Sequence, residues 1–180
     1  MKFSFFAVLI TAVIFASCQA PAEKQYFSES PEIDLGKKVI EAYLSGNFEA
    51  YSEFYSDTAT IYRNNYDDEA AMSWQEYVVD LKEGIEPASS YTMDSPIWEM
   101  IVTDEGDHWV HLWAVWQGSV EATGKTYNIP AMSSMLVVNN KIVIQSDIYN
   151  DTEITLDIMA LAEETEEMEE GEGHDDDEDE

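Results

Sequence analysis

The sequence predicts an α+β domain, in which helices pack on one face of a curved, mainly antiparallel sheet. Three observations lead to this prediction. Apolar residues recur at helical spacing in three segments before residue 90, strands and turns alternate from residue 91 to residue 150, and a last apolar stripe follows Asp151. About 130 residues carry this pattern, which is enough for one domain.

Each expected helix begins with a capping signal. Ser30-Pro31 pairs a cap residue with proline in the first turn. Asn47 can cap a short second helix, and Ser73-Trp74-Gln75-Glu76 is a capping box for a third. Asp151 can cap a last helix. The apolar face of the first helix is Leu35, Val39, Ile40, Tyr43 and Leu44, and that of the last is Ile154, Ile158 and Leu161.

The strands are separated by turn residues. Pro96 predicts a bulge or a sheet edge, because proline has no N–H to donate. Asn139-Asn140 predicts a two-residue hairpin turn, because asparagine tolerates positive φ. The expected strands are residues 58–63, 91–103, 108–120, 126–138 and 141–150.

The N-terminal segment predicts export. Residues 1–17 form a signal peptide with Lys2 before a short apolar run. Ala16-Ser17-Cys18 resembles the lipobox of bacterial lipoproteins, which implies that Cys18, the only cysteine, carries lipid. The alternative is an ordinary secretory signal with an incidental cysteine. We expect a tether over residues 18–30 and an exported protein anchored in a bacterial cell envelope, with the leaflet left open.

Charge separates the C-terminal end from the domain expected over residues 31–162. Residues 163–180 hold thirteen acidic residues and no Lys or Arg, which predicts a disordered tail that is solubilising or binds cations weakly. The whole chain has a formal net charge of −30. Nucleic acid is therefore excluded as an expected partner, since phosphate contacts depend on Lys and Arg. For the same reason, only the lipid on Cys18 would attach the protein to a membrane.

Two motifs carry a resemblance to a known family. One is Trp113-Ala114-Val115-Trp116-Gln117-Gly118 with the turn Thr123-Gly124-Lys125, and the other is the segment from Asn140 to Asn150, in which Asp147 falls on the family's aspartate. The chain resembles the nuclear transport factor 2-like superfamily, in particular its SnoaL-like, polyketide cyclase-like branch. The resemblance implies a cone-shaped sheet whose helices enclose a cavity. Asn140 replaces the family's glycine, and Gln145 replaces a frequent histidine, which removes an acid/base partner.

Asp147 and His111 are the candidate catalytic residues. Strand alternation places Val143, Gln145, Asp147 and Tyr149 on one face, and the resemblance directs Asp147 into the cavity. A carboxyl group in an aromatic pocket could act as an acid or base, although a purely structural role is an equal alternative. His111 shares a face with Trp109, Trp113 and Val115 and is the expected partner of Asp147; the alternative is a half-buried structural histidine.

Aromatic residues are expected to line the ligand pocket. They are Tyr62, Trp74, Tyr77, Trp113 and Tyr149. Arg63, the only arginine, could steer an anionic group, but an ion pair with an acidic neighbour is the preferred interpretation. No metal-binding, nucleophilic or dinucleotide motif is present, so neither a metal nor a cofactor is expected.

Three functions follow as hypotheses. The first is binding of a small, largely apolar molecule by a lipid-anchored domain. The second is a cofactor-independent lyase, isomerase or hydrolase that uses Asp147 with His111 or Tyr62. The third is a protein-interaction module that forms a homodimer through the outer sheet face, with Ile142, Ile144 and Ile148 in the contact.

Overall fold

The fold is a seven-stranded mixed sheet with helices, and the computed structural model describes residues 25–172. The strand order is β1-β4-β5-β6-β7-β2-β3, and only β2 and β7 run parallel. The strands are β1 (Tyr26–Phe27), β2 (Tyr55–Arg63), β3 (Met72–Ser73), β4 (Ser90–Val102), β5 (His108–Val120), β6 (Lys125–Val138) and β7 (Lys141–Tyr149). The predicted α+β class is confirmed.

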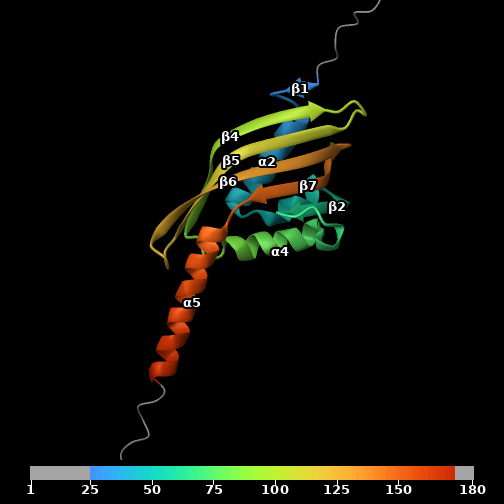
Figure 1. The fold of residues 1–180 in the computed structure, drawn as a ribbon. Helices are drawn as coiled ribbons and strands as arrows, with labels where there is room; N and C mark the ends of the chain where they lie inside the picture. Colours follow the sequence, from blue (N-terminus) through green and yellow to red (C-terminus); the bar gives the residue numbers. More distant parts are fainter. Residues whose placement is uncertain (1–24, 173–180) are drawn as a thin grey trace, which may run out of the picture.

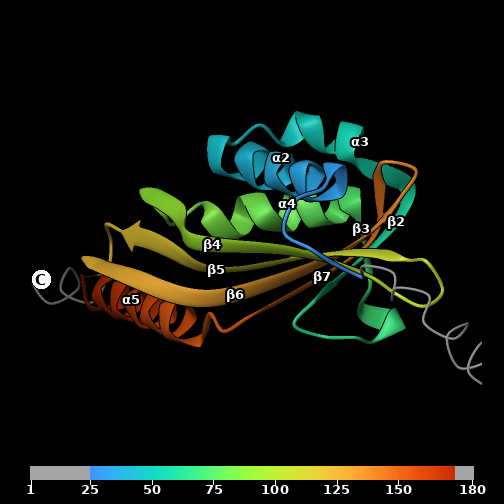
Figure 2. The same ribbon diagram turned by 90° about the horizontal axis from the view of Figure 1, so that it is seen from above.

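Three helices pack on one face of this sheet (Figures 1 and 2). They are α2 (Pro31–Ser45), α3 (Tyr51–Phe54) and α4 (Trp74–Ile85), with short 3₁₀ turns at Phe48–Ala50 and Asp68–Ala70. Two of the predicted caps are confirmed: Ser30 accepts a hydrogen bond from the Ile33 amide, and Ser73 and Glu76 form a capping box. Asn47 precedes the 3₁₀ turn Phe48–Ala50, but its side chain makes no capping hydrogen bond. We call the sheet face under α2 and α4 the inner face and the opposite one the outer face.

The core lies between α2, α4 and the inner face. Ile33, Val110 and Met135 are fully buried there. Helix α2 approaches the sheet closely at Gly36, where a Cβ atom would come within 2.7 Å of the Trp98 ring. A larger residue at this position would therefore push the helix away from β4 and β5.

Two predicted irregularities of the strands are confirmed. The β4–β5 register shifts between Asp94 and Ile97, next to Pro96, and Ser95 has a φ of 50°. Asn139 and Asn140 both have positive φ in the β6–β7 turn, which gives a tight hairpin.

The ends of the domain differ from expectation. Residues 26–27, expected as tether, pair with β4 as strand β1. Helix α5 (Thr152–Glu172) extends into the acidic segment that was expected to be disordered from residue 163, because glutamate, leucine and alanine favour helix despite their charge pattern. It runs away from the sheet beyond the end of β7 (Figure 1). The predicted signal peptide, Cys18 and the end of the tail lie outside the described residues.

Ile142, one of the residues expected in the dimer contact, does not lie on the outer face. Ile142 is fully buried in the core, whereas Ile148 is 56% exposed. The β6–β7 register shifts between Leu136 and Val137, opposite Ile144 and Ile142, so Val143 is an extra residue that reverses the alternation. A simple alternation of β7 therefore misassigned Ile142 to the outer face.

Candidate functional site

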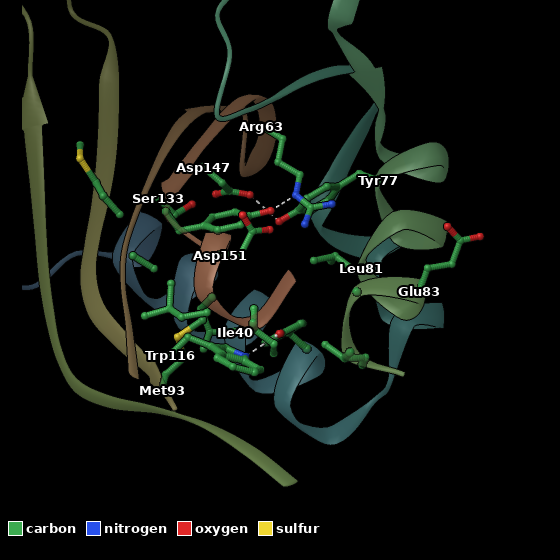
Figure 3. Close-up of a pocket in the computed structure, with 18 of the residues that line it drawn as sticks. Ile40, Arg63, Tyr77, Leu81, Glu83, Met93, Trp116, Ser133, Asp147 and Asp151 are labelled. Carbon is green, nitrogen blue, oxygen red and sulfur yellow. Dashed lines mark hydrogen bonds between the residues drawn. The ribbon is translucent and has the colours of Figure 1, made fainter. Parts of the chain in front are cut away.

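A cavity of about 360 Å³ lies between the inner face, α2, α4 and the start of α5 (Figure 3). Most of its wall is apolar or aromatic. Ile40, Met93 and Trp116 lie toward one end, and Asp147, Ser133 and Tyr77 gather toward the other. Such a combination of an apolar wall with a few convergent polar groups is typical of small-molecule sites.

Asp147 is the central polar group of this cavity. It is 8% exposed and comes from β7, where it faces Ser133 of β6 across the inner face. The Tyr77 hydroxyl of α4 donates a hydrogen bond to Oδ2. The Gln145 side-chain amide donates to Oδ1 at 3.0 Å and to Oδ2 at 2.9 Å. Asp147 is thus held by two neutral donors.

A second tyrosine orients Gln145. The buried Tyr55 hydroxyl donates to Gln145 Oε1, which directs the amide nitrogen toward Asp147 and the Tyr77 hydroxyl. Tyr51 stacks on Tyr55 with ring centroids 5.5 Å apart and an interplanar angle of 8°. Gln145 is therefore held in place as a hydrogen-bond donor to Asp147. The family resemblance had indicated only that Gln145 replaces a histidine.

Burial dominates the protonation of this cluster. It raises the pKa of Asp147 above its ordinary value, while the nearby Ser133 hydroxyl, the hydrogen bonds from Tyr77 and Gln145 and the charge of Arg63 lower it in part. Burial and the charge of Asp147 raise the pKa of Tyr77 well above 10. Tyr77 therefore stays protonated and acts as the donor in its bond with Asp147.

Ser133 has unused hydrogen-bonding capacity. It is 8% exposed and lines the cavity beside Asp147, whose pKa it helps to lower. Its hydroxyl oxygen nevertheless has no hydrogen-bond partner of normal geometry among the described residues. A buried hydroxyl of this kind is costly unless a ligand or water satisfies it.

Charged residues also line the cavity. The Arg63 guanidinium pairs with Asp80, donates to the Tyr149 hydroxyl and lies 5.2 Å from the centroid of that ring. Burial, followed by the charges of Glu83 and Asp151, raises the pKa of Asp80. Asp151 points toward the same space, whereas the Glu83 carboxylate points away from it (Figure 3). The ion pair expected for Arg63 is thus present.

The structure separates His111 from Asp147. His111 lies on the outer face, where Nδ1 is 2.8 Å from Ser134 Oγ, and it pairs with Glu99 across the strands. Its neighbour Leu112 lines the cavity. Because both faces of β5 carry large apolar residues, alternation alone could not identify the face under the helices. The expected catalytic pair therefore cannot meet.

Of the residues predicted to line the pocket, some line the cavity and others lie outside it. Tyr77 and Tyr149 line the cavity. Trp113 is 46% exposed on the outer face, where its indole N–H donates to Glu99. Tyr62 bonds to Asp68 and stacks on Tyr66 in the loop after β2, and Trp74 packs against the core rather than the cavity. The prediction that the pocket is lined by Tyr62, Trp74 and Trp113 is therefore wrong.

Sequence reasoning missed several lining residues. Ser133, Trp116 and the first turns of α5 belong to the cavity. The pairing of Ser133 with Asp147 could not be predicted from the Asn139-Asn140 hairpin, because its register alone would place Met132 opposite Asp147. The bulge at Val143 shifts the register by one residue and brings Ser133 opposite Asp147. The contribution of α5 had no such signal, since its place depends on the whole fold.

Neither a metal site nor a membrane span is evident in residues 25–172. In that part of the chain, no three His, Cys, Asp or Glu side chains come together in a way that could hold a metal ion. None of the helices described there is both long and apolar enough to cross a membrane.

Solved structures place the fold among SnoaL-like proteins. IdmH from Streptomyces antibioticus, a proposed polyketide cyclase, superposes with a TM-score of 0.58 at 16% identity, covering 72% of this chain and 99% of its own. A proposed SnoaL-like polyketide cyclase from Jannaschia sp. CCS1 gives 0.56 at 10% identity, covering 74% and 95%. A proposed polyketide cyclase from Xanthomonas campestris pv. campestris gives 0.55 at 18%, covering 68% and 93%.

The protein therefore shares its fold with proteins described as SnoaL-like polyketide cyclases, which is the fold that the sequence motifs predicted. At these identities the likeness concerns the fold, and activity has to be argued from the site. No family model matches the sequence, and a search of curated proteins gave no match.

Proposed function

We propose that this domain binds a small, largely apolar molecule in the cavity, with a polar group of the ligand directed at Asp147. One observation carries the proposal: a cavity of about 360 Å³ with apolar walls contains one deeply buried carboxyl group and an unsatisfied hydroxyl, Ser133. An apolar wall supplies affinity through burial, and a few fixed polar groups supply orientation.

A fluorescence titration tests this proposal. N-phenyl-1-naphthylamine, a neutral apolar fluorophore, should bind the wild type with micromolar affinity and brighten, as expected for a site of this size. Ala131→Phe fills the cavity from β6 and should abolish the signal. Asn128→Phe, at an exposed position of the same strand, is the matched control. Equal binding by both variants would place the probe elsewhere. Native mass spectrometry of the purified protein would look for a co-purified ligand.

Acid–base catalysis by Asp147 is the second candidate. It is favoured by burial, which raises the pKa of Asp147, and by the proposed cyclase activity of the structural neighbours. The candidate no longer includes His111; Tyr77 is the neighbouring hydroxyl. Deuterium exchange at the α-carbon of small ketones in D₂O, followed by NMR, should be faster with wild type than with Asp147→Asn. Equal rates would leave only binding.

A homodimer through the outer face stays a proposal. An apolar row crosses four strands of the outer face through the paired residues Ile97, Trp113, Met132 and Ile148. In this row Ile97 is 63% exposed, Trp113 46% and Ile148 56%. Such an apolar row favours a contact with another molecule. Sedimentation should show a dimer that Trp113→Lys dissociates; a wild-type monomer at high concentration would contradict it.

Lipid attachment at Cys18 is also proposed, on the strength of the residues that precede it. It would anchor this acidic protein in the cell envelope without a basic surface. Labelled palmitate should enter the wild type and not Cys18→Ser. Equal labelling of the two would overturn the assignment.

A further inference from the structure

The charges around the cavity favour a positive ligand. Its inward-facing charged residues are Asp147 and Asp151, together with the single cation Arg63. Arg63 is already paired with Asp80 and donates to Tyr149. An anionic ligand would therefore meet two carboxylates and find no free cation.

Asp147 lacks a counterion in direct contact. The ion pairs of the described residues involve Asp34, Asp80, Glu32 and Asp157, but not Asp147. Its donors, Tyr77 and Gln145, are neutral. An ionised carboxylate can accept about four hydrogen bonds, so lone pairs remain for a ligand. A buried carboxylate without a cation is costly, and a bound cation would remove this cost.

Ser133 offers a second acceptor at the same end of the cavity. Its oxygen has no partner of normal geometry among residues 25–172, although the residue is buried. An ammonium group carries up to three N–H donors and can bond to Ser133 and Asp147 together. Tyr77 at this end of the cavity, and Tyr51 elsewhere in its lining, provide π-systems that attract cations.

We infer that the ligand is a lipophilic amine, with an apolar or aromatic body in the cavity and one protonated amino group paired with Asp147 and Ser133. This inference rests on the proposed binding function and names the chemical class of its ligand. A neutral alcohol would satisfy Ser133 but leave the charge of Asp147 uncompensated.

Three compounds with one carbon skeleton test the inference. 1-Naphthylmethylamine, 1-naphthylmethanol and 1-naphthoate differ in charge but hardly in size. By calorimetry at neutral pH, the amine should bind about ten-fold or more tightly than the alcohol, since a buried charge pair contributes to affinity. The carboxylate should not bind detectably.

Asp147→Asn identifies the group responsible. It keeps the shape of the side chain and should remove the preference, so that the amine binds the variant no more tightly than the alcohol does. Asp57→Asn removes the same charge at an exposed position of β2 and controls for long-range attraction by the acidic protein. Circular dichroism would establish that both variants are folded.

The outcomes separate the two proposals. Amine preference lost in Asp147→Asn and kept in Asp57→Asn supports the inference. Equal or weaker binding of the amine in the wild type, or a preference that survives Asp147→Asn, overturns it. If the fluorophore binds in the cavity but no naphthyl amine does, the amine inference falls and the binding function stands; if neither binds, both fall.

Discussion

Two pairs of polar residues lie on opposite faces of the sheet. On the inner face, Asp147 lies opposite Ser133; on the outer face, His111 contacts Ser134. The two serines are neighbours in sequence and therefore point in opposite directions. Helix α4 covers the inner pair and supplies Tyr77, whereas the outer pair lies beside the exposed Trp113 and Glu99. The covering layer, not the residue types, makes one pair part of the cavity wall.

Burial acts on the two pairs with opposite signs. It raises the pKa of Asp147 and lowers the pKa of His111, because it disfavours whichever form is charged. Asp147 is held by donors from two elements, and His111 is only partly buried. The inner pair is therefore expected to dominate stability and binding, and the predictions below test this.

The largest loss of stability is expected for Gln145→Leu. This change removes the acceptor of the buried Tyr55 hydroxyl and a donor to Asp147. The free energy of unfolding should fall by about 3 kcal/mol, since each unsatisfied buried group costs about 1–3 kcal/mol. Urea denaturation measures it. Gln117→Leu breaks only an exposed hydrogen bond to Asn128 and should lower the free energy of unfolding far less. Equal decreases in the two variants would show that the buried network stabilises the fold no more than an exposed hydrogen bond does.

Two adjacent residues of β5 sharpen the comparison of the faces. Leu112→Ala should cost about 2 kcal/mol, the low end of the usual range for buried leucine, because Leu112 already borders a cavity. Trp113→Ala should cost under about 1 kcal/mol, because its indole is half exposed. Thermal and urea unfolding of both variants measure the difference. A larger loss for Trp113 would mean that the outer face is covered in solution.

Asp147→Asn should stabilise the protein. Because burial raises the pKa of Asp147, the folded state holds this proton more tightly than the unfolded state, whose aspartate pKa is about 3.9. The wild type therefore loses stability as pH rises from the unfolded toward the folded pKa. At pH 7 the variant should be more stable than the wild type, and the gain should shrink at lower pH.

Urea denaturation across the pH range checks this sign. Asp57→Asn, which removes the same charge at an exposed site, is the matched control. A variant of Asp147 that is destabilised equally at all pH values would indicate that the carboxylate itself holds the fold together.

The smallest effect is expected for His111→Gln. Glutamine can still bond to Ser134, and the outer face around His111 is only partly covered. The free energy of unfolding should change by less than about 0.5 kcal/mol, and binding of the naphthalene probes should not change. A loss of probe binding would connect the two faces and contradict their separation.

The sequence by itself determined the elements and the family of fold. Capping residues, helical and strand periods and the Asn139-Asn140 turn are local signals, because each acts within a few residues of itself. The two family-like motifs added the curved sheet, the cavity and Asp147 as a pocket residue. Gln145 was placed on the face of Asp147, although its role as a donor was not anticipated.

Only the tertiary structure decided which face of the sheet carries the site. Both faces of β5 are rich in large apolar residues, so periodicity separates them without saying which one α2 and α4 cover. The bulge at Val143 reversed the alternation for Ile142, and the positions of α5 and Arg63 depend on contacts between distant segments. Burial, and with it the pKa of Asp147, is a property of these long-range contacts and cannot be read from any local pattern.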